Sequence, residues 1–543
     1  MTPAPENTDV VIAGAGLAGL VTAHELLARG RRVTVLDKDR AERCGGLARE
    51  AFGGILLAGT PEQRRARIRD NPGLALRDWE SYAEFGPDDH WPRAWAECYC
   101  ETSVEAIHRY LHGLGVRFLP VVNWPERGWD RPGNSVPRWH VVWGLGGEIV
   151  TRLRQALAEH PRADRLDLRF GHDVTGLDTE NGRVVGLHGV REDDGTDFRL
   201  RAEHVVIAAG GICGGDLSRV RAHWHRPWGT PPAKLLNGGH IHGDGRLHEA
   251  AAGAGARLTH LDRHWHYAAG VHHPRRLRPD DGLSLVPPRS ALWLDARGRR
   301  VGPPPLVANT DTRHLVETVL GLPGQYSWLV MNRRIARREL AVSGYDFMDA
   351  FRNKRRIKLL RQALFGNDEL LARLLAECPE DLVAADTPAA LARAMDGRNL
   401  YGLRVDAEGM LADIRAYDDE IGRGPRFFND PQLRRIAQAR AYRGDRLRTC
   451  RFQAILDPRA GPLIAVRAFI LSRKSLGGIQ TDLDCRVLAE SGAPVPGLYA
   501  VGEAAGFGGG GINGKRSLEG TFLGGCILTG RRLGQHLGGG IAT

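Results

Sequence analysis

The chain has 543 residues, of which 42% are hydrophobic and 26% are charged, and its net charge is +11. This length exceeds what one hydrophobic core can organise, so two or more domains of ordinary globular composition are expected. The amino terminus lacks a basic segment followed by an apolar run and a cleavage site, and no stretch reaches transmembrane length. We therefore expect a cytoplasmic protein without a signal peptide or a transmembrane anchor.

The positive charge comes from arginines spread along the whole chain. Basic strings at 64–69, 297–300 and 353–358 are possible contacts for polyanions, but dispersed arginine is more typical of a solvated surface. We expect no nucleic acid partner, and a main role in binding RNA or an anionic surface is kept as an alternative. The eight cysteines are scattered without C-x-x-C spacing, which predicts reduced thiols rather than a zinc site or a disulfide framework.

The segment 9–39 carries the first strong motif. An apolar strand at 10–13 leads into Gly14, Gly16 and Gly19, which have G-x-G-x-x-G spacing, and a helical stretch and a second strand ending in Asp37 follow. In this arrangement the first glycine makes the turn, the second admits a pyrophosphate and the third lets helix and strand pack closely. The acid accepts hydrogen bonds from a ribose. The segment predicts a dinucleotide site, but the motif alone does not choose between NAD and FAD.

Two further glycine-rich segments follow strands. The first, "CGGLAREAFGG" at 44–54, comes soon after the second strand, and the second, "AEHVVIAAGG" at 202–211, is a strand that ends in glycines. Near the carboxyl end, "GLYAVGEAAGFGGGG" at 497–511 repeats the pattern. Glycine loses much conformational entropy on folding, so such density favours close approach of the backbone to a ligand. Strand ends so far apart in the chain predict one long ligand, and FAD has that length.

These strings resemble, in order, those of the fumarate reductase and succinate dehydrogenase flavoprotein superfamily, and most closely its 3-ketosteroid-dehydrogenase-like branch of FAD-binding dehydrogenases. The resemblance covers nearly the whole chain and is weakest over about 345–425. Four further strings support the resemblance: "PEQRRARIRDNPGLALRDW" (61–79), "GNSVPRWHVVWG" (133–144), "GPLIAVRAFILSRKSLGG" (461–478) and "KRSLEGTFLGGCILTGR" (515–531).

The resemblance implies an α/β fold, in which a Rossmann-like FAD-binding domain is interrupted by an α+β capping domain that binds substrate. The FAD-binding domain would comprise residues 1–255 and 435–543, and the cap would comprise 256–434, with a helical run at 352–382. The active site is expected where the cap meets the flavin, because ligand pockets favour domain interfaces.

The resemblance also implies the residues that contact non-covalent FAD. Glu503 would lie at the ribityl chain, and the amino end of a helix starting near Ser517 would face the flavin ring, where its dipole stabilises negative charge. The full set of expected contacts is Gly14, Gly16, Leu17, Ala18, Gly19, Asp37, Lys38, Gly45, Gly46, Gly53, Gly54, Ala209, Gly210, Gly211, Asp244, Gly502, Glu503, Ser517 and Leu518.

The sequence departs from the dicarboxylate-reducing relatives at three positions. Leu47 occupies the place of the histidine that binds flavin covalently. Lys474 replaces a histidine before the glycine pair of 477–478, and Asn429–Asp430 replaces an Arg–Asp pair. Dicarboxylate reduction is therefore not expected.

The expected reaction introduces a double bond beside the carbonyl of a bulky, cyclic, ketosteroid-like substrate. It requires a base for the α proton, donors for the enolate oxygen and a hydride acceptor. Among the positions that the resemblance places near the flavin ring, His266 and Tyr267 are the candidates for proton transfer, and the alternative is that both are structural. Arg516 and Lys474 are the candidates for polarising the carbonyl or holding a carboxylate, unless they balance phosphate charge or form internal salt bridges.

Several weaker candidates complete the analysis. His140 could line the pocket, whereas Tyr326 and Tyr442 are better explained as packing residues that need one hydrogen bond. The histidines 260, 264, 272 and 273 lack an accompanying carboxylate set, so no metal is expected. No second nucleotide motif is present, and the electron acceptor is left open between a quinone, a carrier protein and oxygen. An enoate or fumarate-type reductase on the same scaffold is the alternative activity.

Overall fold

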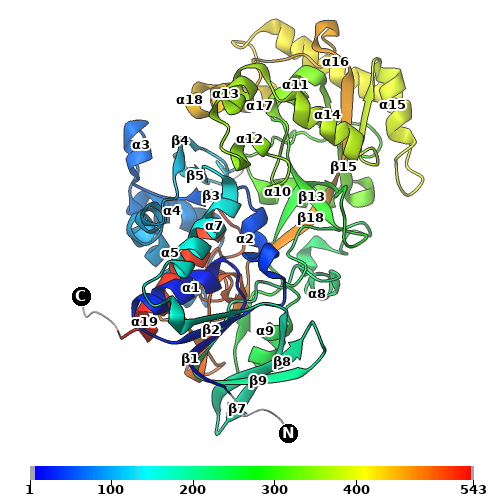
Figure 1. Ribbon diagram of the computed structural model, residues 1–543. Helices are drawn as coiled ribbons and strands as arrows, with labels where there is room; N and C mark the ends of the chain where they lie inside the picture. Colours follow the sequence, from blue (N-terminus) through cyan, green and yellow to red (C-terminus); the bar gives the residue numbers. More distant parts are fainter. Residues whose placement is uncertain (1–5, 130, 540–543) are drawn as a thin grey trace.

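The computed structural model describes residues 6–129 and 131–539, which fold into two regions, each organised by an eight-stranded sheet (Figure 1). The first region occupies the lower half of Figure 1 and combines amino-terminal and carboxyl-terminal segments, since helices α1 and α19 pack against each other. The second region occupies the upper half and comes from the middle of the chain. The α/β fold with an inserted α+β part is confirmed.

The first sheet has the strand order β20-β21-β9-β1-β2-β6, with parallel pairing from β21 to β6. Val10 of β1 pairs with Val33 of β2 on one side and with His204 of β9 on the other. The described apolar residues of β1 and β2 are buried, because helices cover the sheet and leave no polar face. The strands of this sheet are β1 (Glu6–Ala13), β2 (Val33–Leu36), β6 (Leu166–Arg169), β7 (His172–Glu180), β8 (Arg183–Arg191), β9 (Asp197–Ile207), β20 (Arg486–Leu488) and β21 (Pro494–Ala500).

The second sheet is built around β18 (Leu463–Ser475). Its strand order is β14-β15-β18-β12-β13-β16, and β10 and β17 also pair with β18. All of β18 is buried except Lys474, which is half-buried. Its end pairs Lys474 with Trp265 of β12. The other strands are β10 (Leu236–Asn237), β12 (His264–His272), β13 (Gly282–Val286), β14 (Leu292–Leu294), β15 (Tyr326–Asn332), β16 (Ala341–Val342) and β17 (Leu382–Ala385).

Two small sheets and the helices complete the architecture. The small sheets join β3 (Gly54–Leu56), β5 (Trp139–Val142) and β4 (Phe118–Asn123), and pair β11 (Leu258–Thr259) with β19 (Gly478–Ile479). The helices of the first region are α1 (Leu17–Ala28), α2 (Gly46–Glu50), α3 (Pro61–Arg65), α4 (Pro72–Ala83), α5 (His90–Thr102), α6 (Tyr110–Gly113), α7 (Leu145–Ala158), α9 (Arg246–Gly253) and α19 (Thr521–Leu537).

Most helices of the second region lie above its sheet in Figure 1, whereas α8 lies below β18. They include α13 and α14, which lie within the run 352–382 that was predicted to be helical, and α14 ends before β17 begins. The helices are α8 (Ser218–Ala222), α10 (Thr312–Leu320), α11 (Arg333–Glu339), α12 (Asp349–Arg352), α13 (Arg356–Phe365), α14 (Asp368–Glu377), α15 (Pro388–Asp396), α16 (Ala407–Arg423), α17 (Pro431–Ala441) and α18 (Arg443–Arg446).

Strand β18 links the two regions. It belongs to the second sheet by pairing, and the backbone N–H of its last residue, Ser475, donates to Glu503 of the first region at 2.8 Å. The chain returns to the first sheet only with β20. The domain boundaries expected at 255/256 and 434/435 stay predictions, and the sheet pairing adds that the segment 463–475 lies in the second sheet.

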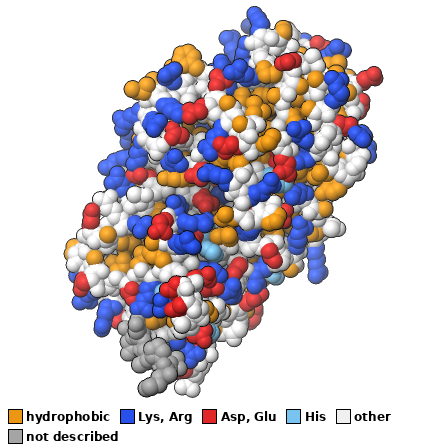
Figure 2. Space-filling model, turned by 45° about the vertical axis from the view of Figure 1, so that its right-hand side comes forward, with side chains coloured by type: hydrophobic (Ala, Val, Ile, Leu, Met, Phe, Trp, Pro, Cys, Tyr) orange, Lys and Arg blue, Asp and Glu red, His pale blue; other side chains and the backbone are white. Residues whose placement is uncertain are grey.

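The surface and the thiols complete the description. Figure 2 shows Lys and Arg side chains distributed over the whole visible face among acidic and apolar ones, rather than gathered into one stripe. All eight cysteines are unpaired. Among the described residues, no helix combines the length and the hydropathy needed to span a bilayer.

Candidate functional site

The smaller of two adjoining cavities lies at the carboxyl ends of the parallel strands of the first sheet, and we call it the glycine-lined cavity. It has a volume of about 150 Å³. Thirteen of the expected cofactor contacts line it, namely Gly14, Gly16, Leu17, Ala18, Asp37, Lys38, Gly45, Gly46, Ala209, Gly210, Gly211, Asp244 and Glu503. Segments from 14 to 503 thus meet at one sheet edge, where ligands bind in doubly wound folds.

The three motif glycines have three different environments. Gly14 has φ +113° and a Cβ there would overlap the carbonyl group of Ala208, while a Cβ on Gly19 would overlap the carbonyl oxygen of Gly14. A Cβ on Gly16 would have its nearest atom 3.9 Å away, so the space in front of Gly16 is open. The first and third glycines are required by the fold, and the second leaves room for a ligand. This cradle fits the pyrophosphate of a dinucleotide.

The acid at the end of β2 holds the glycine turn. Asp37 Oδ2 accepts a hydrogen bond from the backbone N–H of Ala15 at 2.6 Å, and Oδ1 accepts one from Asp39 at 2.8 Å. Lys38 Nζ pairs with Asp173 at 2.8 Å, also at the cavity wall. Asp37 therefore shapes the loop, and its contact with a ribose remains a prediction.

The remaining expected cofactor contacts lie elsewhere. Gly53 and Gly54 line the larger cavity described below, whereas Gly19, Gly502, Ser517 and Leu518 line neither cavity. The backbone N–H of Gly502 donates to Thr529 Oγ1 at 2.9 Å, and Ser517 Oγ lies 3.1 Å from Thr521 Oγ1. These four positions support the fold around the cavities.

The carboxyl-terminal helix begins later than expected. We predicted a start near Ser517, but α19 begins at Thr521. Gly520 has φ +100°, and its carbonyl oxygen accepts a hydrogen bond from the backbone N–H of Leu56 in β3 at 2.9 Å. This turn ties the segment before the helix to β3. The first turn of α19 still faces the larger cavity, through Phe522 and Leu523.

The larger cavity lies between the two regions and has a volume of about 290 Å³, and we call it the interregion cavity. Its lining is mainly apolar and includes Phe52, Trp139, Trp293, Met348 and Phe351. It shares five lining residues with the glycine-lined cavity, namely Leu47, Ala48, Arg473, Glu503 and Cys526. The two cavities therefore adjoin, and a long ligand held in one reaches the other.

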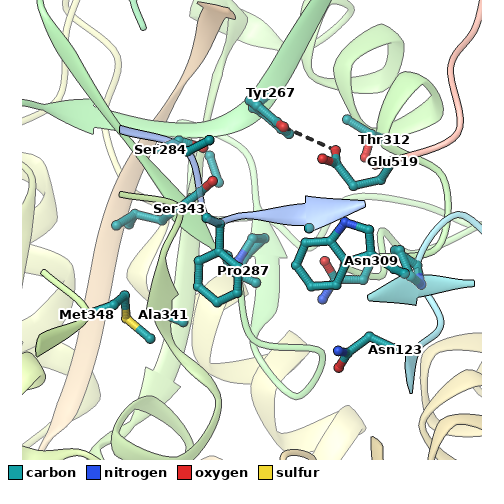
Figure 3. A pocket seen from close by; sticks show the side chains of 18 of the residues that line it. Asn123, Tyr267, Ser284, Pro287, Asn309, Thr312, Ala341, Ser343, Met348 and Glu519 are labelled. Carbon is teal, nitrogen blue, oxygen red and sulfur yellow. Dashed lines mark hydrogen bonds between the residues drawn. The ribbon is translucent and has the colours of Figure 1, made fainter. Parts of the chain in front are cut away.

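A polar group of three side chains lies in the interregion cavity. Tyr267 Oη donates to Glu519 Oε2 at 3.1 Å, the bond that Figure 3 shows, and Lys474 Nζ donates to Tyr267 Oη at 3.4 Å. Lys474 Nζ also lies 3.7 Å from the centre of the Phe522 ring. We call these three residues the Tyr–Glu–Lys group. Two of its members, Tyr267 and Lys474, were predicted from the sequence.

Burial shifts the pKa values of this group and its neighbour. Desolvation lowers the pKa of Lys474 to about 8. Desolvation, and then the Glu519 carboxylate, raise the pKa of Tyr267 well above its ordinary value. Burial also raises the pKa of Glu503 to about 7. Near neutral pH the group therefore holds a protonated phenol and an ammonium close to its titration point.

His266 lies outside both cavities. Successive residues of a strand point to opposite faces, so His266 and Tyr267 separate. The His266 ring stacks on Trp224 with centroids 5.2 Å apart, neither ring nitrogen has a hydrogen-bond partner among the described residues, and burial lowers its pKa to about 3. Its position is that of a neutral core residue, which was the alternative, and does not support proton transfer to substrate.

Arg516 also lies outside the cavities, one layer behind the wall. Its guanidinium pairs with Asp311 and covers the Tyr82 ring at 4.4 Å. Tyr82 Oη donates to Asp311 and to Glu126, and Glu126 accepts hydrogen bonds from Thr312 at the cavity wall. The placement matches the internal salt bridge that we kept as the alternative, and does not support contact with a substrate carbonyl.

The weaker candidates have structural partners. His140 bonds Thr60 Oγ1 at 2.8 Å and the Arg138 carbonyl at 2.7 Å, and it lines neither cavity. Tyr326 donates to Asn399, and Tyr442 donates to the Val122 carbonyl. Tyr326 Oη also accepts a hydrogen bond from the backbone N–H of Leu400 at 3.1 Å, so both tyrosines have the hydrogen-bonded position expected of packing residues.

The four grouped histidines have separate environments. His260 pairs with Asp89. His272 pairs with Asp381 at 2.9 Å and with Glu380 at 3.3 Å, so this histidine has two carboxylates beside it, contrary to the expectation from the sequence. His273 Nδ1 accepts a hydrogen bond from the backbone N–H of Arg275 at 3.0 Å. His264 is buried and lies beside His266, with ring centroids 5.4 Å apart.

Sequence reasoning missed several polar residues of the interregion cavity. Glu519 is given no role by the sequence analysis, although its place shortly before an apolar helix was a signal. The others lie in segments without a motif, and they include Asn123, Glu126, Asn309, Thr312 and Arg448.

Comparison with known proteins agrees with this geometry. A family profile described as FAD binding domain matches residues 9–523. The chain is 40% identical over 549 residues to a KsdD-like steroid dehydrogenase of Mycobacterium tuberculosis, covering 97% of this chain and 95% of that protein. It is similar in structure to a 3-ketosteroid Δ1-dehydrogenase from Sterolibacterium denitrificans in complex with 1,4-androstadiene-3,17-dione, with a TM-score of 0.71, 17% identity and coverage of 98% and 99%. It is also similar to a flavocytochrome c3 fumarate reductase, with a TM-score of 0.67, 21% identity and coverage of 98% and 78%.

Proposed function

Since the chain belongs to the FAD binding domain family and is an FAD-dependent oxidoreductase of the ketosteroid dehydrogenase-like type, we propose that it introduces a carbon–carbon double bond beside the ketone of a bulky, apolar, cyclic substrate. The observation that carries this proposal is the Tyr–Glu–Lys group, which lies in an apolar cavity that adjoins the glycine-lined one. The mycobacterial and Sterolibacterium relatives, named for steroids, support the substrate class.

FAD would be held without a covalent bond by the residues of the glycine-lined cavity, with Gly16 admitting the pyrophosphate and Glu503 at the passage into the interregion cavity. Leu47, which lines both cavities, offers no nucleophile for a covalent link. When bound, FAD supplies the acceptor for a hydride from the carbon β to the ketone.

The Tyr–Glu–Lys group is suited to removing the α proton without creating a buried phenolate. The Tyr267 oxygen takes the proton from carbon while its own O–H proton passes to Glu519 Oε2, 3.1 Å away. The electron pair of the broken C–H bond moves into the enolate. Because Tyr267 stays neutral, the high pKa that burial gives its phenol is no obstacle.

Lys474 is suited to stabilising the enolate oxygen. Its ammonium lies beside Tyr267 and carries no carboxylate partner within ion-pair distance among the described residues, so its donors are available to a ligand. A cation in a desolvated site interacts strongly with developing negative charge. Its lowered pKa, about 8, means that this cation is lost in mildly alkaline solution.

The apolar part of the interregion cavity is suited to recognising the shape of a substrate. Aromatic and aliphatic side chains from both regions form its walls, and a volume of about 290 Å³ is at the lower end of the range for drug-sized ligands. A rigid fused-ring ketone buries apolar surface there with little loss of conformational entropy.

The proposal is tested by mixing the FAD-loaded protein anaerobically with 4-androstene-3,17-dione and related cyclic ketones. We expect the blue absorbance band of the flavin to bleach. Flavin that stays oxidised with every ketone, but is rapidly reoxidised by enones after photoreduction, would instead establish the enoate reductase alternative.

The electron acceptor is a quinone, a carrier protein or oxygen, and the same preparation allows each to be compared as oxidant. Retention on heparin that is lost at modest salt, with no bleaching by any substrate, would favour the RNA or anionic-surface alternative.

A further inference from the structure

One arginine of the interregion cavity has a ligand-binding arrangement that the reaction above does not use. Arg448, which follows α18, lines the cavity and is an exposed residue. Its Nη1 donates to Asn123 Oδ1 at 3.2 Å, and no carboxylate lies within ion-pair distance of it among the described residues. Its single printed partner is a neutral amide oxygen, so this guanidinium is available to a ligand.

The nearby carboxylate is already engaged. Asp445 accepts hydrogen bonds from Arg127 and from Arg289, the latter at 3.3 Å. Two guanidinium groups thus share this carboxylate, and Arg448 is not one of its partners. Desolvation lowers the pKa of Arg448. The charge of Arg289 lowers it further, and the Asp445 carboxylate opposes both effects. An anionic ligand would relieve this excess positive charge.

The position of Arg448 is remote from the Tyr–Glu–Lys group. Its partner Asn123 lies on the opposite side of the pocket from Tyr267 and Glu519 in Figure 3, with Asn309 and Pro287 between them. A ligand whose ketone lies at Tyr267 therefore extends toward Arg448 with its far end.

We propose that Arg448 binds a carboxylate at the end of the substrate remote from the ring ketone, so that the preferred substrates are polycyclic keto acids rather than neutral ketones. A planar guanidinium matches a carboxylate with two parallel hydrogen bonds. The inference rests on the proposed function for the orientation of the ketone.

The test measures binding by calorimetry on the oxidised, FAD-loaded protein. The ligands are 3-oxo-4-androstene-17β-carboxylic acid and its methyl ester, which differ only in the charge at the remote end. We expect the acid to bind about 10- to 100-fold more tightly than the ester. Arg448→Met should remove this preference and leave the affinity for the ester unchanged, and Arg448→Lys should restore part of it. Arg443→Met, at an exposed arginine of α18 outside the cavity, is the matched control.

Equal affinities for acid and ester in the unmodified protein would overturn the assignment, as would failure of both to bind. An equal loss of both ligands in Arg448→Met would show a structural role only. These outcomes are separate from failure of the proposed function, because bleaching by 4-androstene-3,17-dione does not depend on a carboxylate.

A second observation concerns α13, which forms part of the cavity wall and has an unpartnered outer face. Leu359, Gln362 and Ala363 line the interregion cavity on one side. On the other side Ile357, Leu360, Leu364 and Phe365 are 80%, 61%, 47% and 67% exposed, and no residue of the helix is buried. Four large apolar side chains on one exposed helix face indicate an interaction surface.

Cations border this apolar face. Arg356 and Arg361 are exposed, and neither has an ion-pair partner among the described residues, whereas Lys358 on the same helix is paired with Glu369. No acidic residue occurs between 356 and 365. The surface therefore complements an apolar layer bordered by negative charge, as found where anionic lipid headgroups meet acyl chains.

We infer that the outer face of α13 binds the surface of an anionic phospholipid bilayer, which places a wall of the interregion cavity at the membrane. The contact is peripheral. An apolar substrate dissolved in the bilayer would then reach the cavity without crossing water. This inference is independent of the identity of the substrate.

The test is sedimentation of the FAD-loaded protein with vesicles of equal parts phosphatidylglycerol and phosphatidylcholine, compared with vesicles of phosphatidylcholine alone. We expect binding to the anionic vesicles that weakens with salt. Replacing Ile357, Leu360, Leu364 and Phe365 together by serine should lower it at least about tenfold. Phe427→Ser, at an apolar residue that is 69% exposed elsewhere, is the control. Unchanged binding by the serine variant, no binding by the unmodified protein, or a dimer that the serine variant abolishes would each overturn the inference.

Discussion

The two cavities differ in what their walls are made of. The glycine-lined cavity has ten glycines in its wall, and its turns are held where a Cβ at Gly14 or Gly19 would overlap a carbonyl group. The interregion cavity is made of side chains from distant segments, such as Tyr267, Lys474 and Glu519. A backbone site fixes one ligand shape and tolerates few substitutions, whereas a side-chain site can change its chemistry by single substitutions at little cost to the fold. The predictions below test this contrast.

The largest effect is expected within the glycine motif itself. Gly19→Val should destabilise the first region by more than about 4 kcal/mol, because its Cβ overlaps the Gly14 carbonyl oxygen. Gly16→Val should leave the unfolding free energy of the FAD-free protein nearly unchanged, since the space before it is open, while FAD affinity falls at least about 100-fold. Denaturant unfolding and flavin titration measure the two quantities. Equal unfolding free energies for both variants would contradict the assignment of separate roles.

The next effect concerns the buried pair behind the cavity wall. Arg516→Ala should lower the unfolding free energy by about 3–5 kcal/mol, because Asp311 is left as an uncompensated buried charge. Chemical denaturation measures this loss, and Arg446→Ala at an exposed position is the control. A variant with unchanged stability and abolished turnover would instead return Arg516 to a catalytic role.

A smaller effect is expected from the charge of Lys474. Below pH 8 the ammonium is present, and it is lost as the pH rises through the pKa of about 8, so turnover should fall on the alkaline side. Lys474→Met should lower turnover roughly tenfold at pH 7 and remove this dependence. A pH profile at fixed flavin content measures both. The same alkaline decline in the methionine variant would assign it to another group.

The smallest effect is expected at His266. His266→Gln removes a stacked ring from the core beside Trp224 and should lower the melting temperature by a few degrees. Turnover per bound flavin should not change, because the residue lines neither cavity. A loss of turnover in fully folded protein would show that His266 takes part in the reaction.

The nucleotide half of the molecule was predictable because its requirements are local. A strand, a glycine turn and a helix occupy consecutive residues, and each of Gly14, Gly16 and Gly19 has a steric reason that holds in any such unit. The distant strand ends at 209–211 and 502–503 were also predictable, because a backbone that approaches a ligand closely again requires glycine. Of these, Gly502 supports the fold instead of lining a cavity.

The substrate half was predictable only in part, because its groups meet through tertiary structure. Choosing between His266 and Tyr267 required the face of β12, whose register to β18 shifts between Trp265 and His266. Glu519 reaches Tyr267 from the turn before α19, a contact between residues 252 positions apart. Arg448 and Asn123 come from segments without a motif, so no local pattern could place them together.

The central claim, that the Tyr–Glu–Lys group removes a proton beside a ketone, is tested most directly by stopped-flow bleaching of the flavin with 4-androstene-3,17-dione in Tyr267→Phe and Glu519→Gln. Both variants should still fold and bind FAD, since Tyr267→Phe loses only the hydrogen bonds to Glu519 and from Lys474, and Glu519→Gln changes only the first of these. The account predicts that the bleaching rate falls by about 10²- to 10⁴-fold in Tyr267→Phe and by less in Glu519→Gln. Bleaching at the unmodified rate in Tyr267→Phe would contradict it.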